Sequence, residues 1–131
     1  MRVPEKVVQR HIVQLFRSLG GYAWELGTRR GRRDYDKGTR QTPGVPDLIG
    51  FLPPRQTPRW VLLFVEAKAQ GGRLRPEQAK FRELCLAADV AHLVGDLDVV
   101  IAWCVEHEYL RRDHVAHYRL AAALQEPSCS R

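Results

Sequence analysis

The chain has 131 residues, 44% of them hydrophobic, and a formal net charge of +6 with a pI near 9.7. These values fit one domain with a modest core and exclude a chain that is disordered throughout. The net positive charge favours a polyanionic binding partner. Three separated cysteines without a CxxC pair argue against a zinc site or a disulfide framework. No apolar run suits a membrane span or a signal peptide, so we expect a single intracellular domain over residues 1–131.

The first expected element is a helix that begins near Pro4 and ends at Gly20-Gly21. Glu5 falls on the line of its apolar face, so the carboxylate is either an N-terminal charge that suits the helix dipole or a group directed into a site. Gln9, one turn later, either contacts nucleic acid or is solvated. The apolar residues that recur at helical spacing are Val8, Ile12, Leu15, Phe16 and Leu19.

Residues 22–26 predict a first strand, and the segment after it predicts a long basic loop that extends to Gly44. This loop directly precedes an acidic cluster, so we expect it to grip a phosphate backbone rather than to serve only as a solvated surface. Its basic residues are Arg29, Arg30, Arg32, Arg33, Lys37 and Arg40. Aromatic residues of this region could stack on bases, but aromatic residues at strand spacing are more often in the core, so we favour stacking less. The aromatic residues concerned are Tyr22, Trp24 and, within the loop, Tyr35.

The next stretch predicts a β-hairpin. Residues 48–52 and 60–65 are short apolar runs that suit buried strands, and the proline-rich residues 53–58 between them suit the turn. In a symmetric hairpin without a bulge, Asp47 lies opposite Glu66. The open end of the hairpin therefore brings two carboxylates together.

Packed carboxylates repel each other, and one of them tends to take up a proton. A divalent cation removes this cost, and hard oxygen ligands suit Mg²⁺ or Mn²⁺. Because side chains alternate along a strand, Lys68 shares a face with Glu66. Asp47, Glu66 and Lys68 around such an ion are the parts of a centre for phosphodiester hydrolysis. The alternative is a hairpin with solvated charged ends, which we favour less for this combination.

A second helix is expected to begin at Pro76, after a basic loop that carries Arg73 and Arg75. Gln78 lies on the inward side of its first turn, either as a satisfied polar residue or as part of the site. The basic residues of this region form a second basic patch, which either binds nucleic acid or only solubilises the surface. The apolar stripe of the helix is expected to be Phe81, Leu84, Cys85 and Ala88.

Three further elements are expected. Residues 91–94 predict a strand, Asp96 caps a following helix, and residues 113–124 predict a last helix. Ligand sets need more than two residues in a defined geometry, so we expect the histidines of this half to be surface residues rather than metal ligands. These are His92, His107, His114 and His117.

Pro46-Asp47 followed by Glu66-Ala67-Lys68 resembles the PD-(D/E)xK nuclease signature. The surrounding spacing resembles the VRR-NUC (virus-type replication-repair nuclease) branch of that superfamily over about residues 5–105. The family usually has a serine or similar residue where residues 73–76 stand here, a departure that does not touch the acidic cluster. The matching segments are residues 44–49, 65–68, 71–72 and 78–81, with Glu5 and Gln9 in the first helix.

The resemblance implies a restriction-endonuclease-like α/β core, a central mixed sheet flanked by helices in αβββαβ order. It implies a metal-dependent DNA endonuclease in which Asp47, Glu66 and the Ala67 carbonyl hold Mg²⁺ or Mn²⁺. Lys68 would then act on the attacking water. Glu5 would add a metal ligand or bridge through water, and Gln78 would support the nucleophile.

The resemblance also implies processing of branched DNA, such as flaps or four-way junctions, in replication and repair. Short family members often act as homodimers, and neither a membrane nor a small-molecule cofactor is implied. Two alternatives stay open. One is a non-catalytic nucleic-acid-binding module with structural acids, and the other is a sequence-specific restriction-type endonuclease.

Overall fold

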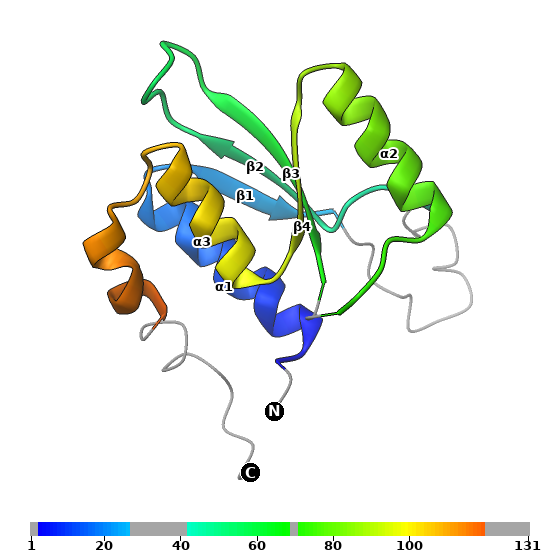
Figure 1. Ribbon diagram of the computed structural model, residues 1–131, viewed down its shortest axis with the longest axis horizontal. Helices are drawn as coiled ribbons and strands as arrows, with labels where there is room; N and C mark the ends of the chain where they lie inside the picture. Colours follow the sequence, from blue (N-terminus) through cyan, green and yellow to red (C-terminus); the bar gives the residue numbers. More distant parts are fainter. Residues whose placement is uncertain (1–2, 27–41, 69–70, 120–131) are drawn as a thin grey trace, which may run out of the picture.

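A computed structural model describes residues 3–26, 42–68 and 71–119. It has one mixed sheet flanked by helices (Figure 1), which confirms the predicted class and element order. The elements are α1 (Glu5–Ser18), β1 (Tyr22–Glu25), β2 (Leu48–Leu52), β3 (Val61–Ala67), α2 (Pro76–Ala87), β4 (Ala91–Gly95), α3 (Leu97–Glu106) and the 3-10 turn η2 (Arg112–His114). No helix of the described part of the chain is long and apolar enough to cross a membrane.

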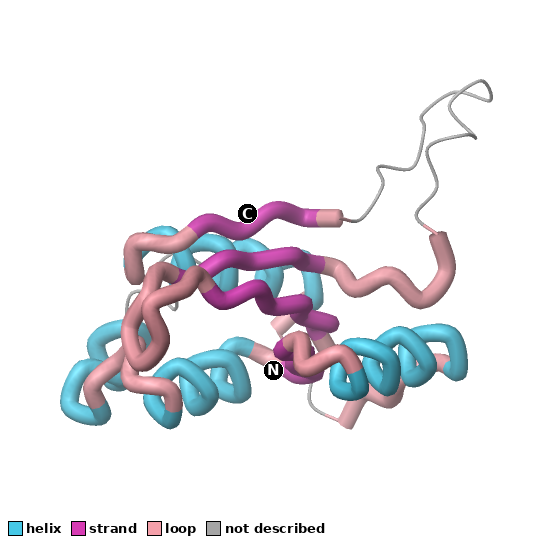
Figure 2. The backbone as a smooth tube through the Cα atoms, turned by 90° about the horizontal axis from the view of Figure 1, so that it is seen from above, coloured by secondary structure: helices cyan, strands magenta, loops and turns pink. Residues whose placement is uncertain are grey.

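The four strands lie in the order β1-β2-β3-β4 and run side by side in Figure 2. The first two pairs are antiparallel, and β4 joins β3 in parallel. In the hairpin, Leu48 pairs with Val65, which is the register predicted from the sequence. One residue further along this register, Asp47 lies opposite Glu66. The residues after β2 form the turn, so the open end of the hairpin is the end that carries the charged side chains.

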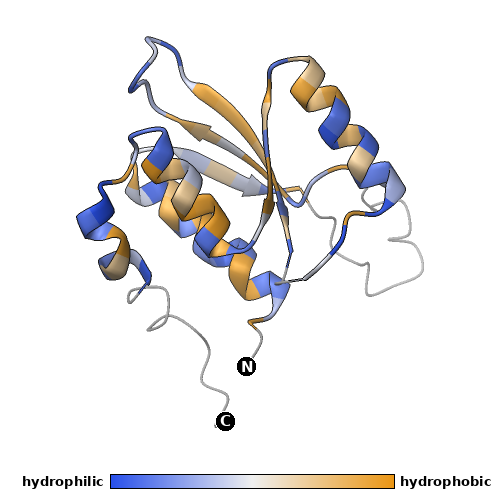
Figure 3. Ribbon diagram, in the orientation of Figure 1, coloured by the Kyte–Doolittle hydropathy of each residue, from blue (hydrophilic) through white to orange (hydrophobic). Residues whose placement is uncertain are grey.

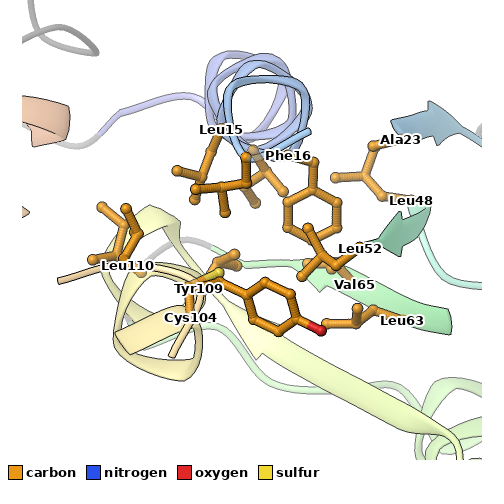
Figure 4. Close-up of a cluster of buried hydrophobic side chains, with 14 of the residues drawn as sticks. Leu15, Phe16, Ala23, Leu48, Leu52, Leu63, Val65, Cys104, Tyr109 and Leu110 are labelled. Atoms are coloured by element: carbon orange, nitrogen blue, oxygen red, sulfur yellow. The ribbon is translucent and has the colours of Figure 1, made fainter. Parts of the chain in front are cut away.

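One face of the sheet is buried under α1 and α3, and the apolar stripe predicted for α1 is buried in full. Figure 3 shows hydrophobic residues concentrated on β2, β3 and α3. In Figure 4 the ring of Phe16 points from α1 toward leucines and a valine of β2 and β3. A Cβ at Gly50 would lie 2.1 Å from Cε2 of Phe16, so β2 and α1 can approach this closely only because residue 50 has no side chain.

The opposite face of the sheet is only partly covered. In Figure 1 α2 lies on the far side of β4 from α1 and α3. Its Phe81 packs edge-on against Phe64 of β3, with ring centroids 5.1 Å apart. The predicted apolar stripe of α2 is wrong in part, because Cys85 is buried while Leu84 is 57% exposed and Ala88 is exposed. The helix contacts β3 and β4 along a narrow line and does not extend over β1 and β2.

Two burial predictions are wrong for the same reason, namely where α2 lies. Tyr22 and Trp24 are not core residues, because they lie on the edge strand β1 and α2 does not reach them. His92 is not a surface residue, because Arg82 of α2 covers it.

The elements after β4 follow the prediction where the structure describes them. The predicted cap of α3 is confirmed, because an Asp96 carboxylate oxygen accepts a hydrogen bond of 3.2 Å from the Val99 N–H. The predicted last helix is described only as η2 and the helical residues 115–119, and its remainder lies outside the described residues.

Candidate active site

The charged residues at the open end of the hairpin are held by the sheet itself. Asp47 directly precedes β2, and its Oδ2 accepts a hydrogen bond of 2.9 Å from the Ala67 N–H across the strand pair. Lys68 directly follows β3, and its N–H donates to the Gly95 carbonyl of β4 at 3.0 Å. Strand alternation then places the Lys68 side chain on the same face as that of Glu66. Three neighbouring strands therefore position the acid pair and the lysine.

Glu66 is buried in β3 with only 3% of its surface exposed. Burial raises the pKa of its carboxyl group to about 8. The neighbouring Asp47 carboxylate raises this pKa further, through its charge and its capacity to accept a hydrogen bond from the protonated Glu66, while the charge of Lys68 opposes the rise and that of Glu5 adds to it. Without a cation, Glu66 therefore holds a proton at neutral pH. Its buried Oε2 accepts no hydrogen bond from any donor among residues 3–26, 42–68 and 71–119.

Gln78 connects α2 to this carboxyl group. Its side-chain amide donates to Oε1 of Glu66 at 3.0 Å, and its carbonyl oxygen accepts from the Arg75 N–H at 2.8 Å. The second bond is one half of a capping box, in which the third helical residue satisfies the N–H that precedes the helix. Because both ends of the amide are engaged, its orientation is fixed. Gln78 thus occupies Oε1 of Glu66 and leaves Oε2 without a donor among the residues that are described.

The turn before Asp47 depends on Gly44. This residue has a φ of +92°, which disfavours any residue with a side chain, and a Cβ on it would lie 2.7 Å from the Glu77 carbonyl oxygen. The turn therefore contacts the first turn of α2. As a result, Asp47 and Gln78 approach Glu66 from two different elements.

Comparison with known proteins identifies the family of this chain. The model of the VRR-NUC domain family matches residues 3–96, most of the chain. The chain belongs to the VRR-NUC domain family. A solved structure described as a VRR_NUC domain is 27% identical, and the alignment covers 79% of this chain and 95% of that one, with a TM-score of 0.56. Curated proteins give no significant match.

Family membership makes the sheet a restriction-endonuclease-like core of a nuclease-type domain. In this VRR-NUC domain Glu5 is exposed at the first residue of α1, not on the buried face as predicted, because the buried face begins only at Val7. Its charge still raises the pKa of Glu66. Gln9 is 9% exposed, which excludes the alternative in which it is simply solvated. No group of three or more His, Cys, Asp or Glu side chains within the described ranges is arranged to hold a metal ion.

The basic residues predicted to bind nucleic acid fall into two groups. Arg73 and Arg75 are exposed just before α2, and the backbone of Arg75 binds Gln78. The loop group lies outside the described residues, so its role stays a prediction, as does that of Tyr35. The loop group is Arg29, Arg30, Arg32, Arg33, Lys37 and Arg40.

One polar contact near the site was not foreseen. Arg82 of α2 donates to the His92 carbonyl at 2.6 Å and lies 3.1 Å from Nδ1 of the same residue. Burial and the charge of Arg82 lower the pKa of His92 to about 4, so the imidazole is neutral and its Nδ1 can accept. The contact between Arg82 and His92 fixes α2 against β4. It lies two residues before Val94, which pairs with Glu66 across the strands. No sequence spacing indicates a pair that joins a helix to the next strand in this way.

Proposed function

We propose that this VRR-NUC domain is a metal-dependent endonuclease that hydrolyses phosphodiester bonds of DNA. Its active site would be formed by Asp47, Glu66 and Lys68. The observation that supports the proposal most is the state of Glu66, whose buried Oε2 lacks a donor among the described residues and whose pKa is raised to about 8 beside Asp47. Burial of an unsatisfied carboxyl oxygen is costly, and a divalent cation bound between two carboxylates would offset that cost. The donor set is made of hard oxygens, which suits Mg²⁺ or Mn²⁺.

In the proposed site, Asp47, Glu66 and the Ala67 carbonyl would hold the ion, and Glu5 would contribute from the start of α1. A bound ion of this kind lowers the pKa of water and polarises a phosphate oxygen. An ion in the site would favour the ionised form of Glu66, which would supply the second carboxylate. Gln78 keeps Oε1 engaged at 3.0 Å, so Oε2 would be the oxygen available to the ion.

Lys68 is proposed to act on the substrate rather than on the fold. Its side chain shares the face of Glu66 and its charge lowers the pKa of that carboxyl group, which supports a position of the ammonium group near the acid pair. There it would orient or deprotonate the attacking water. Its positive charge would also offset the negative charge that develops on the phosphate in the transition state.

Cleavage of DNA by the purified protein tests the proposal. With Mg²⁺ or Mn²⁺ the protein should cut DNA, and EDTA should abolish cutting. Asp47→Ala and Lys68→Ala should each still bind DNA. Each should reduce the rate of cutting by about 100-fold or more, in line with the loss of a positioned catalytic group. Glu83→Ala, which removes an exposed carboxylate of α2, is the matched control and should cut normally. Full activity in Asp47→Ala would overturn the proposal.

We further propose that the substrate is branched DNA, recognised by shape, and that two chains act together as a homodimer. A panel of linear duplex, flap and four-way-junction DNA separates the possibilities. Preferred cutting of branched DNA, by a species with the mass of two chains in light scattering, supports this extension. Discrete fragments from linear duplex would instead indicate a restriction-type enzyme. Binding that is indifferent to EDTA, without cleavage of any substrate, would indicate a non-catalytic module.

A further inference from the structure

Three aromatic side chains form an exposed row on the sheet face that α2 leaves uncovered. We call Tyr22, Trp24 and Trp60 the aromatic strip. They are 56%, 52% and 51% exposed. The rings of Tyr22 and Trp24 stack with centroids 6.1 Å apart and an interplanar angle of 11°, and Trp60 continues the row 6.2 Å from Tyr22. A contiguous exposed apolar surface of this kind marks an interaction site.

The aromatic strip lies on the same face of the sheet as the acid pair. Trp24 pairs with Ile49, and Ile49 pairs with Phe64, so all three side chains project from the face that carries Glu66. Trp24 is separated from β3 by two interstrand spacings, roughly 10 Å. The next contact along β1 is the Leu26 N–H, which donates to the Asp47 carbonyl at 2.7 Å. The strip therefore begins beside the candidate active site and extends toward the turn of the hairpin.

An aromatic residue of the neighbouring strand β2 lies next to Tyr22 and Trp24. Trp24 packs edge-on against Phe51 of β2, with centroids 6.0 Å apart, and Phe51 pairs with Tyr22 across the strands. Tyr22 and Trp24 belong to the paired strand β1 and Trp60 directly precedes β3, so the rings are presented on or next to the sheet. Such a platform can accept flat partners without a large loss of conformational freedom.

Positive charges lie at both ends of the strip. Arg59 directly precedes Trp60 and is exposed, and Lys68 directly follows β3 at the end of the hairpin that carries the acid pair. The acidic residue of β1, Glu25, is directed to the other face by strand alternation and forms an ion pair with Lys6 at 3.7 Å. A second copy of this chain, with its net charge of +6, would bring like charges together. Aromatic rings between cations fit single-stranded nucleic acid.

We infer that the aromatic strip binds the unpaired bases of a single-stranded DNA arm next to the site of cleavage. Bases in a duplex have their faces covered by their neighbours, so only an unpaired strand can stack on these rings. The inference rests on the proposed function in one respect: it takes the bound single strand to be an arm of the DNA that the enzyme cuts. It narrows the substrate class to DNA that carries a single-stranded segment.

Equilibrium binding in EDTA tests the strip without any cleavage. Trp24→Ala and Trp60→Ala should each weaken binding of a fluorescent single-stranded oligothymidylate about tenfold, as expected for the loss of one base stack. Trp24→Tyr should retain most of the affinity, because the ring is kept. An oligonucleotide of equal length that lacks bases should bind the wild type and the alanine variants equally. The matched control is Leu86→Ala, which removes a 55% exposed side chain of α2 and should leave binding unchanged.

Tryptophan fluorescence gives a second readout in the same samples. Base stacking on Trp24 or Trp60 should quench the emission of the wild type. In a double variant with Trp24→Phe and Trp60→Phe, the remaining Trp103 stacks on His107 at 4.0 Å and is not part of the strip. Its emission should therefore not respond to the oligonucleotide. Quenching of the same size in the double variant would contradict the inference.

The outcomes separate this inference from the proposed nuclease activity. If the protein cuts no DNA but the alanine variants lose affinity for the single strand, the strip is supported and the nuclease proposal fails. If the alanine variants bind the single strand as tightly as the wild type, the inference is overturned whether or not the protein cuts. Conversion of a dimer to a monomer by Trp24→Ala, with unchanged affinity for the strand, would overturn it too and identify the strip as a contact between two copies.

Discussion

At the scale of single residues, two buried groups give the stability of the metal-free protein opposite dependences on pH. The pKa of Glu66 is raised from 4.5 to about 8, so the stability it contributes is fully present below pH 4.5 and is lost as the pH rises through 8. The pKa of His92 is lowered from 6.5 to about 4, so its contribution is present above pH 6.5 and is lost as the pH falls through 4. Of these two groups, only Glu66 changes its contribution to stability between pH 6.5 and 8, so that window separates its effect from that of His92.

We therefore expect the free energy of unfolding in EDTA to fall by roughly 1.5 kcal/mol between pH 6.5 and pH 8. The reason is that over this range the unfolded chain has already released the Glu66 proton whereas the folded protein retains it, so a rise in pH favours the unfolded state. Urea denaturation at pH 6.5, 7.2 and 8 measures the fall, and Glu66→Gln should abolish it. Mg²⁺ should raise the stability of the wild type more at pH 8 than at pH 6.5. An equal fall in Glu66→Gln would show that another group titrates.

The sequence predicts which acids meet, but it does not predict how buried they are. Asp47 and Glu66 could be paired from the register of one hairpin, which depends on local spacing. The burial of Glu66 and the use of only one of its oxygens depend on how α2, the next element along the chain, packs against the hairpin. The exposure of Trp24 was missed for a related reason, since strand spacing alone does not show which part of a sheet face a helix covers.

At the scale of elements, the site requires that the turn before β2 contacts the start of α2. Gly44 makes this contact possible, and Gly71 offers a matched control. Both have positive φ, +92° and +84°, but a Cβ on Gly44 would lie 2.7 Å from the Glu77 carbonyl oxygen, while one on Gly71 would have nothing within 4 Å. Substitutions at these two positions therefore separate the cost of backbone strain, which both share, from the cost of a steric clash with Glu77, which only Gly44 has.

Gly71→Ala should cost about 1 kcal/mol of stability, the strain of a left-handed residue with a side chain. Gly44→Ala should cost roughly 2–4 kcal/mol, because the turn must also move away from α2. Urea denaturation of both variants gives the comparison. Gly44→Ala should also lose cleavage activity under conditions where it remains folded, since Asp47 is displaced relative to Gln78. Equal costs at the two positions would mean that the contact with Glu77 contributes nothing.

The order of the elements was predictable because each one carries its own signal. The stripe of α1, the cap of α3 and the proline-rich turn between residues 53–58 can each be read from a few neighbouring residues. The stripe of α2 was wrong at Leu84 because its sequence does not show that the helix touches only two strands. The Arg82–His92 contact was missed because it depends on how α2 and β4 pack in space.

At the scale of the whole molecule, the net charge of +6 predicts binding to DNA that weakens with salt. Net charge alone does not say where the phosphates lie. We propose that the basic loop before the hairpin contacts them directly, and that its arginines act locally rather than through the overall charge. The distinction can be tested by removing the same number of charges at two places. The loop set is Arg29, Arg30, Arg32 and Arg33, and the control set is Arg10, Arg17, Arg111 and Arg112.

Each set is replaced by glutamine, so the two variants have the same net charge. A direct phosphate contact releases about 0.9 counterion on duplex DNA, so the slope of log affinity against log salt should become shallower by roughly 3 to 4 in the loop variant. The control variant should keep nearly the wild-type slope, because its residues on α1 and around η2 are expected to act only through long-range charge, which salt screens. Fluorescence anisotropy with duplex DNA from 50 to 300 mM salt, in about four steps, measures both slopes. Equal changes in the two variants would attribute binding to net charge, and no change in the loop variant would place the phosphate contacts elsewhere on the protein.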